Sequence, residues 1–370
     1  MIKIAVVGLG KMGISHFSIV NAHPEVETVV CDASRIILDG IGKYTGVRTF
    51  RDYDAMLETA APDAVVIATP SRLHAPMVRG ALERGIHVFC EKPFCLDWRE
   101  SEDLARLAAE KGLVSQVGYH CRYVGAFQEM RRLVDAGAIG EITHVLAETY
   151  GPVVLKPKGS TWRTSRVEGG GCLYDYAAHP INLVNWCFGV PDQISGTVMN
   201  GIFSADTDDE VYSTFTYRSG LSVQLSVNWS DASHRKMSTR MTLTGPGGRI
   251  SADRQEVQAY LRAPVPGLDG YGEGWSVKYT TELTAPVRFY LRGEEYSAQI
   301  EDFIEAVAAA KAGTGAASRS PNGFAGAAET DRIIALMLAD RERERAALEP
   351  AEAARPPARR RGWFGSRRAG

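Results

Sequence analysis

The segment Gly8-Leu9-Gly10-Lys11-Met12-Gly13 carries three glycines at the spacing used to bind a dinucleotide. An apolar run precedes it and an amphipathic run follows, which predicts a turn from a strand into a helix. Gly8 would permit the tight bend, Gly10 would let the backbone approach a pyrophosphate, and Gly13 would let helix and strand pack closely. The amides of Lys11 and Met12 at the helix N-terminus would then bind the phosphates. The alternative is a glycine turn that binds no nucleotide.

Asp32 stands 19 residues after Gly13, at the end of the next apolar run. A carboxylate there accepts hydrogen bonds from the adenosine ribose hydroxyls of NAD and repels the 2′-phosphate of NADP. Arg35 follows and could stack on adenine or partly offset that repulsion. We therefore expect NAD as the cofactor, with NADP possible. A solvated Asp32 without a ligand is the alternative.

Two more segments follow apolar runs and would reach the same crevice, since open α/β sheets bind ligands at the carboxyl ends of their strands. The residues expected to line the cofactor site there are Thr69, Pro70, Ser71, His74, Glu91 and Lys92. For Ser71 and His74 the alternative is a plain helix N-cap and an exposed histidine.

Lys92 is the first candidate catalytic residue. Pro93 follows it directly, and the pair comes after the apolar run His87–Cys90. A lysine held at that strand end would project over the crevice, where a cation can orient the nicotinamide ribose and hydrogen-bond a substrate hydroxyl. Partial burial would lower its pKa toward the working range. A solvated surface lysine is the alternative.

Asp175 and His179 are the second and third candidates, four residues apart in an otherwise apolar segment that begins with three glycines. On a helix that spacing places both side chains on one face. The apolar neighbours predict a pair at least half buried, and an imidazole near a carboxylate suits proton transfer near neutral pH. Because Pro180 disfavours helical backbone at His179, the pair would straddle a kink or a helix start. A core hydrogen bond without a catalytic role is the alternative.

The elements that must position these groups change character along the chain. Residues 1–122 alternate short apolar runs with amphipathic ones. The predicted strands are Ile2–Val7, Thr28–Cys31, Ala64–Ala68, His87–Cys90 and Val114–Val117, and the clearest helices are Leu73–Arg84 and Trp98–Lys111. Apolar runs without alternation indicate strands buried on both faces, and the strand–helix succession indicates βαβ units. The predicted fold class for residues 1–122 is a doubly wound parallel α/β sheet.

Residues 123–348 predict a second domain of different construction. The strands with period-two alternation are Asp209–Tyr217, Leu221–Trp229, Met237–Thr244 and Val257–Leu261, and turns with glycine join them at 218–220 and 245–248. A mostly antiparallel sheet follows from this pattern. A loop is expected over Ala263–Gly274, and helices over Glu295–Lys311 and Gly323–Arg343. Residues 349–370 hold six Arg and two Glu without periodicity, which predicts a disordered basic tail. That tail is either a solvated end or a contact for an anionic membrane surface or a partner.

Composition excludes several classes of protein. At 370 residues the chain is long enough for two domains, and 45% apolar with 23% charged residues is typical of a globular protein. A formal net charge of −2 gives no reason to expect nucleic acid as a partner. No run is long and apolar enough for a membrane helix. The six cysteines show no metal-ligand spacing, so we expect reduced core thiols, no metal and a cytoplasmic location.

Taken together, the motifs resemble those of the Gfo/Idh/MocA oxidoreductases, over roughly residues 1–345. The matching segments are the glycine turn with Asp32, Thr69-Pro70-Ser71 with His74, Glu91-Lys92-Pro93, Gly118–Tyr123, Trp162-Arg163, and Gly169-Gly170-Gly171 with Asp175 and His179. The resemblance implies a Rossmann domain and a second α/β domain with a large open-faced sheet. It also implies hydride transfer between a nicotinamide cofactor and a secondary alcohol of a sugar, sugar derivative or cyclitol such as inositol. Association through the sheet, as a homodimer or homotetramer, is implied as well.

By that resemblance Lys92 positions substrate and nicotinamide, Asp175 holds a substrate hydroxyl, and His179 is the general acid/base. The expected substrate wall consists of Tyr119, His120, Arg122, Tyr150, Lys156, Trp162, Arg163 and Tyr176. This chain departs from the family pattern at His120, Ala177 and Asn182, which leaves the substrate open. Two other functions stay open: NAD kept bound through one cycle of epimerisation, elimination or hydride shuttling, and a non-catalytic nucleotide-binding regulator.

Overall fold

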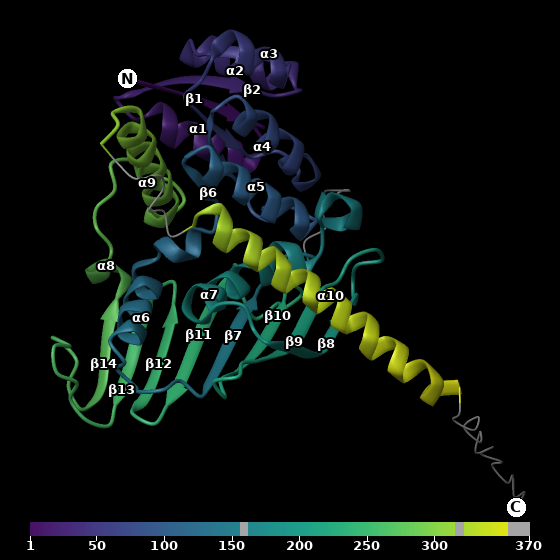
Figure 1. The fold of residues 1–370 in the computed structure, drawn as a ribbon, viewed down its shortest axis with the longest axis vertical. Coiled ribbons are helices and arrows are strands. Elements are labelled where there is room, and N and C mark those ends of the chain that lie inside the picture. The colour runs from purple at the N-terminus through teal and green to yellow at the C-terminus, as the bar shows by residue number, and fades with distance from the viewer. Residues whose placement is uncertain (156–161, 315–321, 354–370) are drawn as a thin grey trace, which may run out of the picture.

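The computed structural model describes residues 1–155, 162–314 and 322–353, and it contains two sheets (Figure 1). The first has six parallel strands in the order β3-β2-β1-β4-β5-β6. Its strands are β1 (Ile2–Val7), β2 (Val26–Cys31), β3 (Arg48–Phe50), β4 (Ala64–Ile67), β5 (His87–Cys90) and β6 (Ser115–Val117). This is the doubly wound arrangement predicted for residues 1–122, and the strand order reverses between β1 and β4.

Helices cover both faces of this sheet because its strands are apolar on both sides. They are α1 (Lys11–Asn21), α2 (Arg35–Thr45), α3 (Tyr53–Ala60), α4 (His74–Glu83) and α5 (Trp98–Glu110). All four residues of β4 are buried, as are Ile4, Val6 and Val7 of β1. The loops after β1 and β4 therefore leave a rigid edge at the point where the strand order reverses.

The second sheet has eight strands in the order β14-β13-β12-β11-β7-β10-β9-β8. They are β7 (His144–Tyr150), β8 (Gln193–Asn200), β9 (Glu210–Thr216), β10 (Ser222–Asn228), β11 (Ser238–Gly245), β12 (Gly248–Asp253), β13 (Glu256–Leu261) and β14 (Gly274–Tyr279). Every pair is antiparallel except β7 with β10. The expected mostly antiparallel sheet is confirmed.

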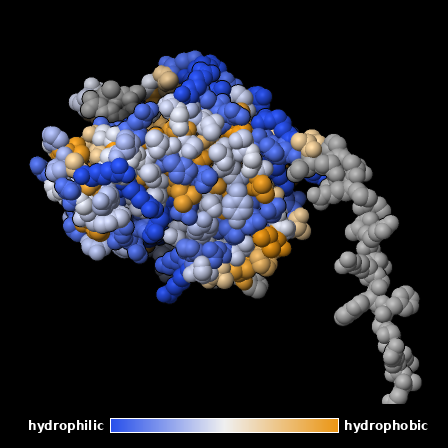
Figure 2. Space-filling view, turned by 90° about the horizontal axis from the view of Figure 1, so that it is seen from below, coloured by the Kyte–Doolittle hydropathy of each residue, from blue (hydrophilic) through white to orange (hydrophobic). Residues whose placement is uncertain are grey.

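One face of this sheet is covered by helices and the other is open. Val145, Ala147 and Thr149 of β7 are buried, whereas the alternate residues are partly exposed. Helices α6 (Gly125–Asp135) and α7 (Ala178–Phe188) pack on the buried face, and α8 (Thr280–Leu283) follows β14. Viewed from below, the surface is a mixture of hydrophilic residues and scattered hydrophobic ones (Figure 2).

The last two helices tie the two domains together. Helix α9 (Glu294–Lys311) lies against the first sheet, where Ile300, Phe303 and Val307 pack with residues of β1 and α1. Helix α10 (Phe324–Ala353) crosses from α5 to β8 and α7 (Figure 1). Helix α9 belongs to the segment 123–348 predicted as the second domain, and it completes the core of the first sheet. Helix α10 also extends past the predicted end at Arg343 and into the segment expected as a tail.

The cysteines and the lengths of the helices test two expectations that came from composition. All six cysteines are free thiols, and five of them are buried, as expected for reduced core residues. In the described parts of the chain, no helix combines the length and the apolar character needed to cross a bilayer. Residues 354–370 of the expected tail lie outside the described residues.

Candidate active site

The glycine turn joins β1 to α1 at the edge where the sheet reverses. Gly8 has φ +84°, and a Cβ there would lie 2.9 Å from the Ala68 carbonyl carbon. A Cβ at Gly13 would lie 1.6 Å from the Gly8 carbonyl oxygen, so no larger residue fits at either position. A Cβ at Gly10 would meet open space, and no side chain caps the N-terminus of α1, which begins with Lys11 and Met12. The N-terminus of α1 can therefore be approached by a phosphate group.

Asp32 follows β2 and faces the same turn. Its carboxylate accepts hydrogen bonds from the backbone N–H of Leu9 at 2.5 Å and of Ser34 at 2.7 Å. These bonds orient the carboxylate while its remaining lone pairs stay available for ribose hydroxyls. Arg35 begins α2, is well exposed, and lies 3.5 Å from Asp39 on its own helix. The residues present therefore fit an adenosine ribose at Asp32, with Arg35 at the surface.

The loop after β4 is linked to the segment after β5 by His74. Thr69 and Pro70 precede a short 3₁₀ turn that begins at Ser71, and His74 begins α4. The imidazole is buried, with Nδ1 2.9 Å from the Pro93 carbonyl and Nε2 3.0 Å from the Thr69 carbonyl. The alternative of an exposed histidine is therefore wrong, because His74 is buried and bonds both the loop after β4 and the segment after β5.

Glu91 directly follows β5 and precedes Lys92. Its carboxylate is buried, bonds His16 Nε2 at 2.7 Å and accepts a hydrogen bond from the backbone N–H of Lys92 at 3.1 Å. Burial raises the pKa of Glu91, but His16 and Lys92 outweigh it and lower the pKa overall. A Cβ at Gly118 would lie 2.9 Å from a Glu91 oxygen, so β6 closes over this carboxylate. These contacts hold the segment that carries Lys92.

Lys92 meets Asp175 across the interface of the two domains. Lys92 Nζ donates hydrogen bonds to Asp175 Oδ1 at 2.6 Å and to the Asp175 carbonyl at 2.9 Å. Arg163 Nε donates to the other carboxylate oxygen at 2.7 Å. Burial alone would raise the pKa of Asp175, but the two cations hold it at about 2. Asp175 is therefore an ionised carboxylate between two cations, in a cluster that carries a net positive charge.

His179 lies beyond the π-helical turn Leu173–Ala177, at the second position of α7. The prediction of a kink or helix start at Pro180 is confirmed, because the widened turn ends where α7 begins. Asp175 and His179 are only 4% and 2% exposed, as expected. The Asp175 oxygens bond Lys92 and Arg163 instead of His179.

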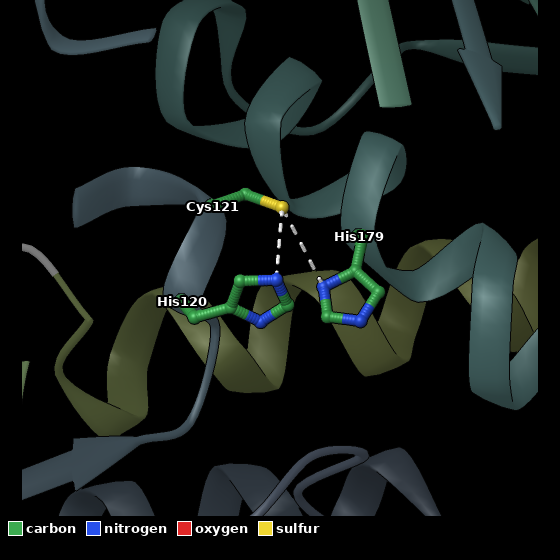
Figure 3. A group of neighbouring side chains, drawn as sticks. All are labelled: His120, Cys121 and His179. Atoms are coloured by element: carbon green, nitrogen blue, oxygen red, sulfur yellow. Dashed lines mark hydrogen bonds between the residues drawn. The ribbon is translucent and has the colours of Figure 1, made fainter. Parts of the chain in front are cut away.

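The neighbours of His179 are rings and a thiol. Its Nδ1 lies 3.9 Å from Cys121 Sγ, and its ring stands edge-on to His120 with centroids 4.7 Å apart (Figure 3). Burial lowers the pKa of His179 well below its usual value, and the charge of Lys92 lowers it further. The ring is therefore neutral near pH 7, and Lys92 is close enough for its charge to disfavour protonation of the ring.

The other residues expected to form the substrate wall lie in different surroundings. His120 and Trp162 lie at the cluster: His120 stacks on Tyr296 at 4.5 Å, and the Trp162 ring lies under the Arg163 guanidinium. Tyr119, Arg122 and Tyr176 are buried: Tyr119 stands edge-on to His179, Arg122 bonds Asn182 of α7, and Tyr176 packs on Trp229. Tyr150 points to the open face of the second sheet, where its hydroxyl bonds Ser226 at 2.8 Å. Lys156 lies outside the described residues.

Tyr150 is not brought to the Lys92–Asp175 cluster, and its strand explains why. Side chains alternate along β7, so a residue beside the buried Thr149 faces the opposite side of the sheet. Sequence reasoning missed Cys121 and Tyr296, which surround the histidines. Cys121 is the chain neighbour of His120, but its contact with His179 and the contact of Tyr296 with His120 join segments far apart in the chain, which no local spacing indicates.

Comparison with known proteins agrees with this geometry. Residues 2–119 match the family model of an oxidoreductase family with an NAD-binding Rossmann fold. Residues 127–251 match the model of the GFO/IDH/MocA C-terminal domain. The chain belongs to the Gfo/Idh/MocA family. The predicted resemblance, the α/β fold class and NAD as the expected cofactor are thereby confirmed.

Relatives of this family member span most of its length. The rhizopine catabolism protein MocA of Rhizobium meliloti is 27% identical over 354 residues, covering 91% of this chain and 93% of that protein. The 2,7-anhydro-N-acetylneuraminate hydratase of Escherichia coli is 26% identical over 271 residues, which cover 71% of this chain and 70% of that protein. A levoglucosan dehydrogenase in complex with NADH and levoglucosan superposes with a TM-score of 0.79 at 21% identity, over 93% and 98% of the two chains.

Proposed function

We propose that this protein is an NAD-dependent dehydrogenase that oxidises a secondary alcohol of a sugar or sugar derivative, in which Lys92, Asp175 and His179 act on the reacting carbinol. The observation that carries this proposal is the Lys92–Asp175 contact of 2.6 Å beside the neutral His179. The cluster lies between the first sheet, which carries the dinucleotide-binding turn, and the second domain.

His179 would be the general base. Oxidation of a carbinol requires that the hydroxyl proton leave as the hydride departs, and a neutral imidazole can accept it. Nδ1 faces the Cys121 thiol, whereas Nε2 lies on the ring edge turned away from it (Figure 3). Nε2 is therefore the atom that would take the substrate proton. General-base catalysis of this kind contributes about 10²–10⁴ in rate.

Lys92 would stabilise the negative charge that develops on the substrate oxygen. Its Nζ is held by two acceptors of Asp175, which fix its position before a substrate arrives. A preorganised donor costs no reorganisation during the reaction, and removing one such donor typically costs about 3 kcal/mol of transition-state stabilisation. Asp175 would bind a neighbouring substrate hydroxyl, with Arg163 keeping its charge in place.

The cofactor site would be formed by the glycine turn, Asp32 and the loop after β4. When bound, NAD would supply the group that accepts the hydride from the carbinol carbon. The turn would hold the pyrophosphate on the α1 amides, and Asp32 would accept hydrogen bonds from the ribose hydroxyls. The open space beside Gly10 and the uncapped α1 terminus support this assignment.

The deciding experiment is a substrate screen with the purified protein. NAD and NADP are each offered with panels of sugars, anhydrosugars, nucleotide sugars and cyclitols, and reduced cofactor is followed by absorbance. We expect NAD-dependent turnover with at least one sugar, lost in both Lys92→Ala and His179→Ala. Turnover that both variants retain would contradict the proposal.

A redox-neutral cycle is the second candidate, favoured by the relative that is a hydratase. In that reaction tightly held NAD would be reduced and reoxidised within one turnover. Stoichiometric nicotinamide on the purified protein, together with product formation that needs no added NAD, would support it. Turnover that depends on free NAD would exclude it.

We also propose that the open face of the second sheet joins copies of this chain into a homodimer or homotetramer. Trp275, Val277 and Tyr279 alternate outward along β14, and the Trp275 ring packs against Tyr260. Exposed apolar groups of this size gather where surfaces associate. The free thiols support a cytoplasmic location, which cell fractionation would test.

A further inference from the structure

Three buried side chains that lie close together in the candidate active site are of types that bind metal ions. His120 Nε2, Cys121 Sγ and His179 Nδ1 all lie within 4.8 Å of one another, and all three residues are buried. Cys121 Sγ is 3.8 Å from His120 Nε2 and 3.9 Å from His179 Nδ1 (Figure 3). The three atoms point toward a common centre, and the Tyr296 hydroxyl lies 3.4 Å from His120 Nε2.

The spacing of these atoms is close to that of a tetrahedral zinc site. With Zn–S near 2.3 Å and Zn–N near 2.05 Å, the sulfur–nitrogen edge of a tetrahedron is about 3.6 Å. The observed edges of 3.8 and 3.9 Å are a few tenths longer. The two nitrogens lie within 4.8 Å of each other, and rotation of the imidazole rings would have to bring them closer on binding. Two imidazoles and one sulfur favour Zn²⁺ over Mg²⁺ or Ca²⁺, which prefer oxygen ligands.

We propose that His120, Cys121 and His179 form a zinc-binding site, and that Zn²⁺ bound there inhibits the enzyme. Three protein ligands leave the fourth position of the ion for water. Binding converts the Cys121 thiol to a thiolate, and the displaced proton goes to solvent. No bond to the substrate and no electron transfer is involved.

The inhibitory effect rests on the proposed function and follows from the tautomer of His179. A neutral imidazole carries one proton, and a metal on Nδ1 leaves that proton on Nε2. Nε2, the ring atom turned away from Cys121, then becomes a donor and can no longer accept the substrate proton. The ion also fixes the ring in place. Zn²⁺ thus removes the general base without displacing NAD.

Charges around the group are compatible with a cation. Zn²⁺ with one thiolate adds a net single positive charge beside Lys92. The Lys92 ammonium is offset by Asp175 Oδ1 at 2.6 Å. The Glu91 carboxylate acts on His120 as well, against the charges of Arg254 and Arg292. These two buried carboxylates limit the repulsion that the ion meets.

The metal site is tested first by binding, without any enzymatic assay. Chelator-treated full-length protein is titrated with Co²⁺, and a sulfur-to-cobalt charge-transfer band is expected at one ion per chain. Zn²⁺ should abolish that band and bind with the same stoichiometry by calorimetry. Absence of the band, or binding without 1:1 saturation, would overturn the site whether or not a substrate is known.

Cys121→Ser is the informative variant, because it removes the soft ligand while keeping a small polar side chain. Loss of an outer partner of a metal ligand costs 10–100-fold in affinity, so loss of the ligand itself should cost at least ~10²-fold. Cys187→Ser is the matched control, since that thiol lies at the end of α7 and should leave Zn²⁺ affinity unchanged. Equal Zn²⁺ affinity in Cys121→Ser and the wild type would contradict the proposal.

Inhibition is tested separately, once a substrate is found. Zn²⁺ should lower kcat at least ~10-fold with the Kd for NAD unchanged, and chelator should restore it. Cys121→Ser, compared with its own metal-free turnover, should resist Zn²⁺. If Zn²⁺ increases kcat, the inhibitory role is wrong even though the site exists. If Cys121→Ser binds no metal and remains equally sensitive to Zn²⁺, inhibition arises elsewhere.

Discussion

Lys92 Nζ and Asp175 Oδ1 lie 2.6 Å apart although 83 residues separate them in the chain. Lys92 follows a strand of the first sheet, and Asp175 belongs to the π-helical turn of the second domain. π-Helical turns are rare and are often found at functional sites. This contact joins the two domains at the point where the dinucleotide-binding edge faces the second sheet.

Replacement of either central residue should reduce turnover. Lys92→Ala and His179→Ala should each lower kcat by at least ~10², because one removes the cation at the developing alkoxide and the other removes the base. The Kd for NAD, measured by fluorescence titration, should stay within a few-fold. Lys43→Ala, at an exposed site over Tyr44, is the control and should match the wild type. Near-normal kcat in both site variants would remove them from the mechanism.

Asp32→Ala should change the choice of cofactor. The carboxylate favours ribose hydroxyls and repels a 2′-phosphate, so its loss should weaken NAD binding and narrow the gap to NADP. Dissociation constants for both cofactors provide the measurement, with Asp103→Ala, at an exposed carboxylate of α5, as the control. An unchanged preference would mean that another group reads the ribose.

The buried carboxyl group of Asp331 should make the stability of the fold depend on pH. Its Oδ2 accepts hydrogen bonds from Ser101 and from the Cys95 backbone, and burial raises its pKa from the ordinary value of 3.8 to about 7. Between those two pH values the folded protein therefore keeps a proton that the unfolded chain releases. The free energy of unfolding should fall as pH rises through that window, by up to about 1.4 kcal/mol per pH unit from this group.

Asp331→Asn removes this titration and keeps an acceptor for Ser101. Urea unfolding gives the free energy of unfolding at pH 5 and at pH 8, and its change from pH 5 to pH 8 should be more positive in Asp331→Asn than in the wild type. Asp39→Asn, at an exposed carboxylate, should behave as the wild type does. Equal pH sensitivity of Asp331→Asn and the wild type would be the contrary result.

Trp275→Glu tests the proposed interface. A carboxylate among Val277, Tyr279 and Tyr260 would be costly to bury against a second copy, so the oligomer should dissociate toward monomer. Light scattering coupled to size exclusion measures the mass. Tyr44→Glu, an exposed aromatic of α2, should leave the mass unchanged. If Trp275→Glu keeps the wild-type mass, association uses another surface.

Local sequence pattern was sufficient to predict much of the first domain. The predicted strands Ile2–Val7 and His87–Cys90 coincide with β1 and β5, because apolar runs buried on both faces need no partner to be recognised. The functions of Gly8 and Gly13 also follow from local geometry, since Gly8 has φ +84° and a Cβ at Gly13 would collide with the Gly8 carbonyl oxygen. Side-chain alternation along β7 could have excluded Tyr150 from the site.

By itself the sequence determined the doubly wound sheet, the dinucleotide-binding turn and the three residues proposed to act on substrate. Only the tertiary structure decided that α9 packs on the first sheet, that Arg163 shares Asp175 with Lys92, and that Cys121 lies between His120 and His179. The physical reason is that backbone conformation and periodic burial depend on neighbours along the chain. Contacts between charged groups, thiols and rings depend on how distant segments pack, and 58 residues separate Cys121 from His179.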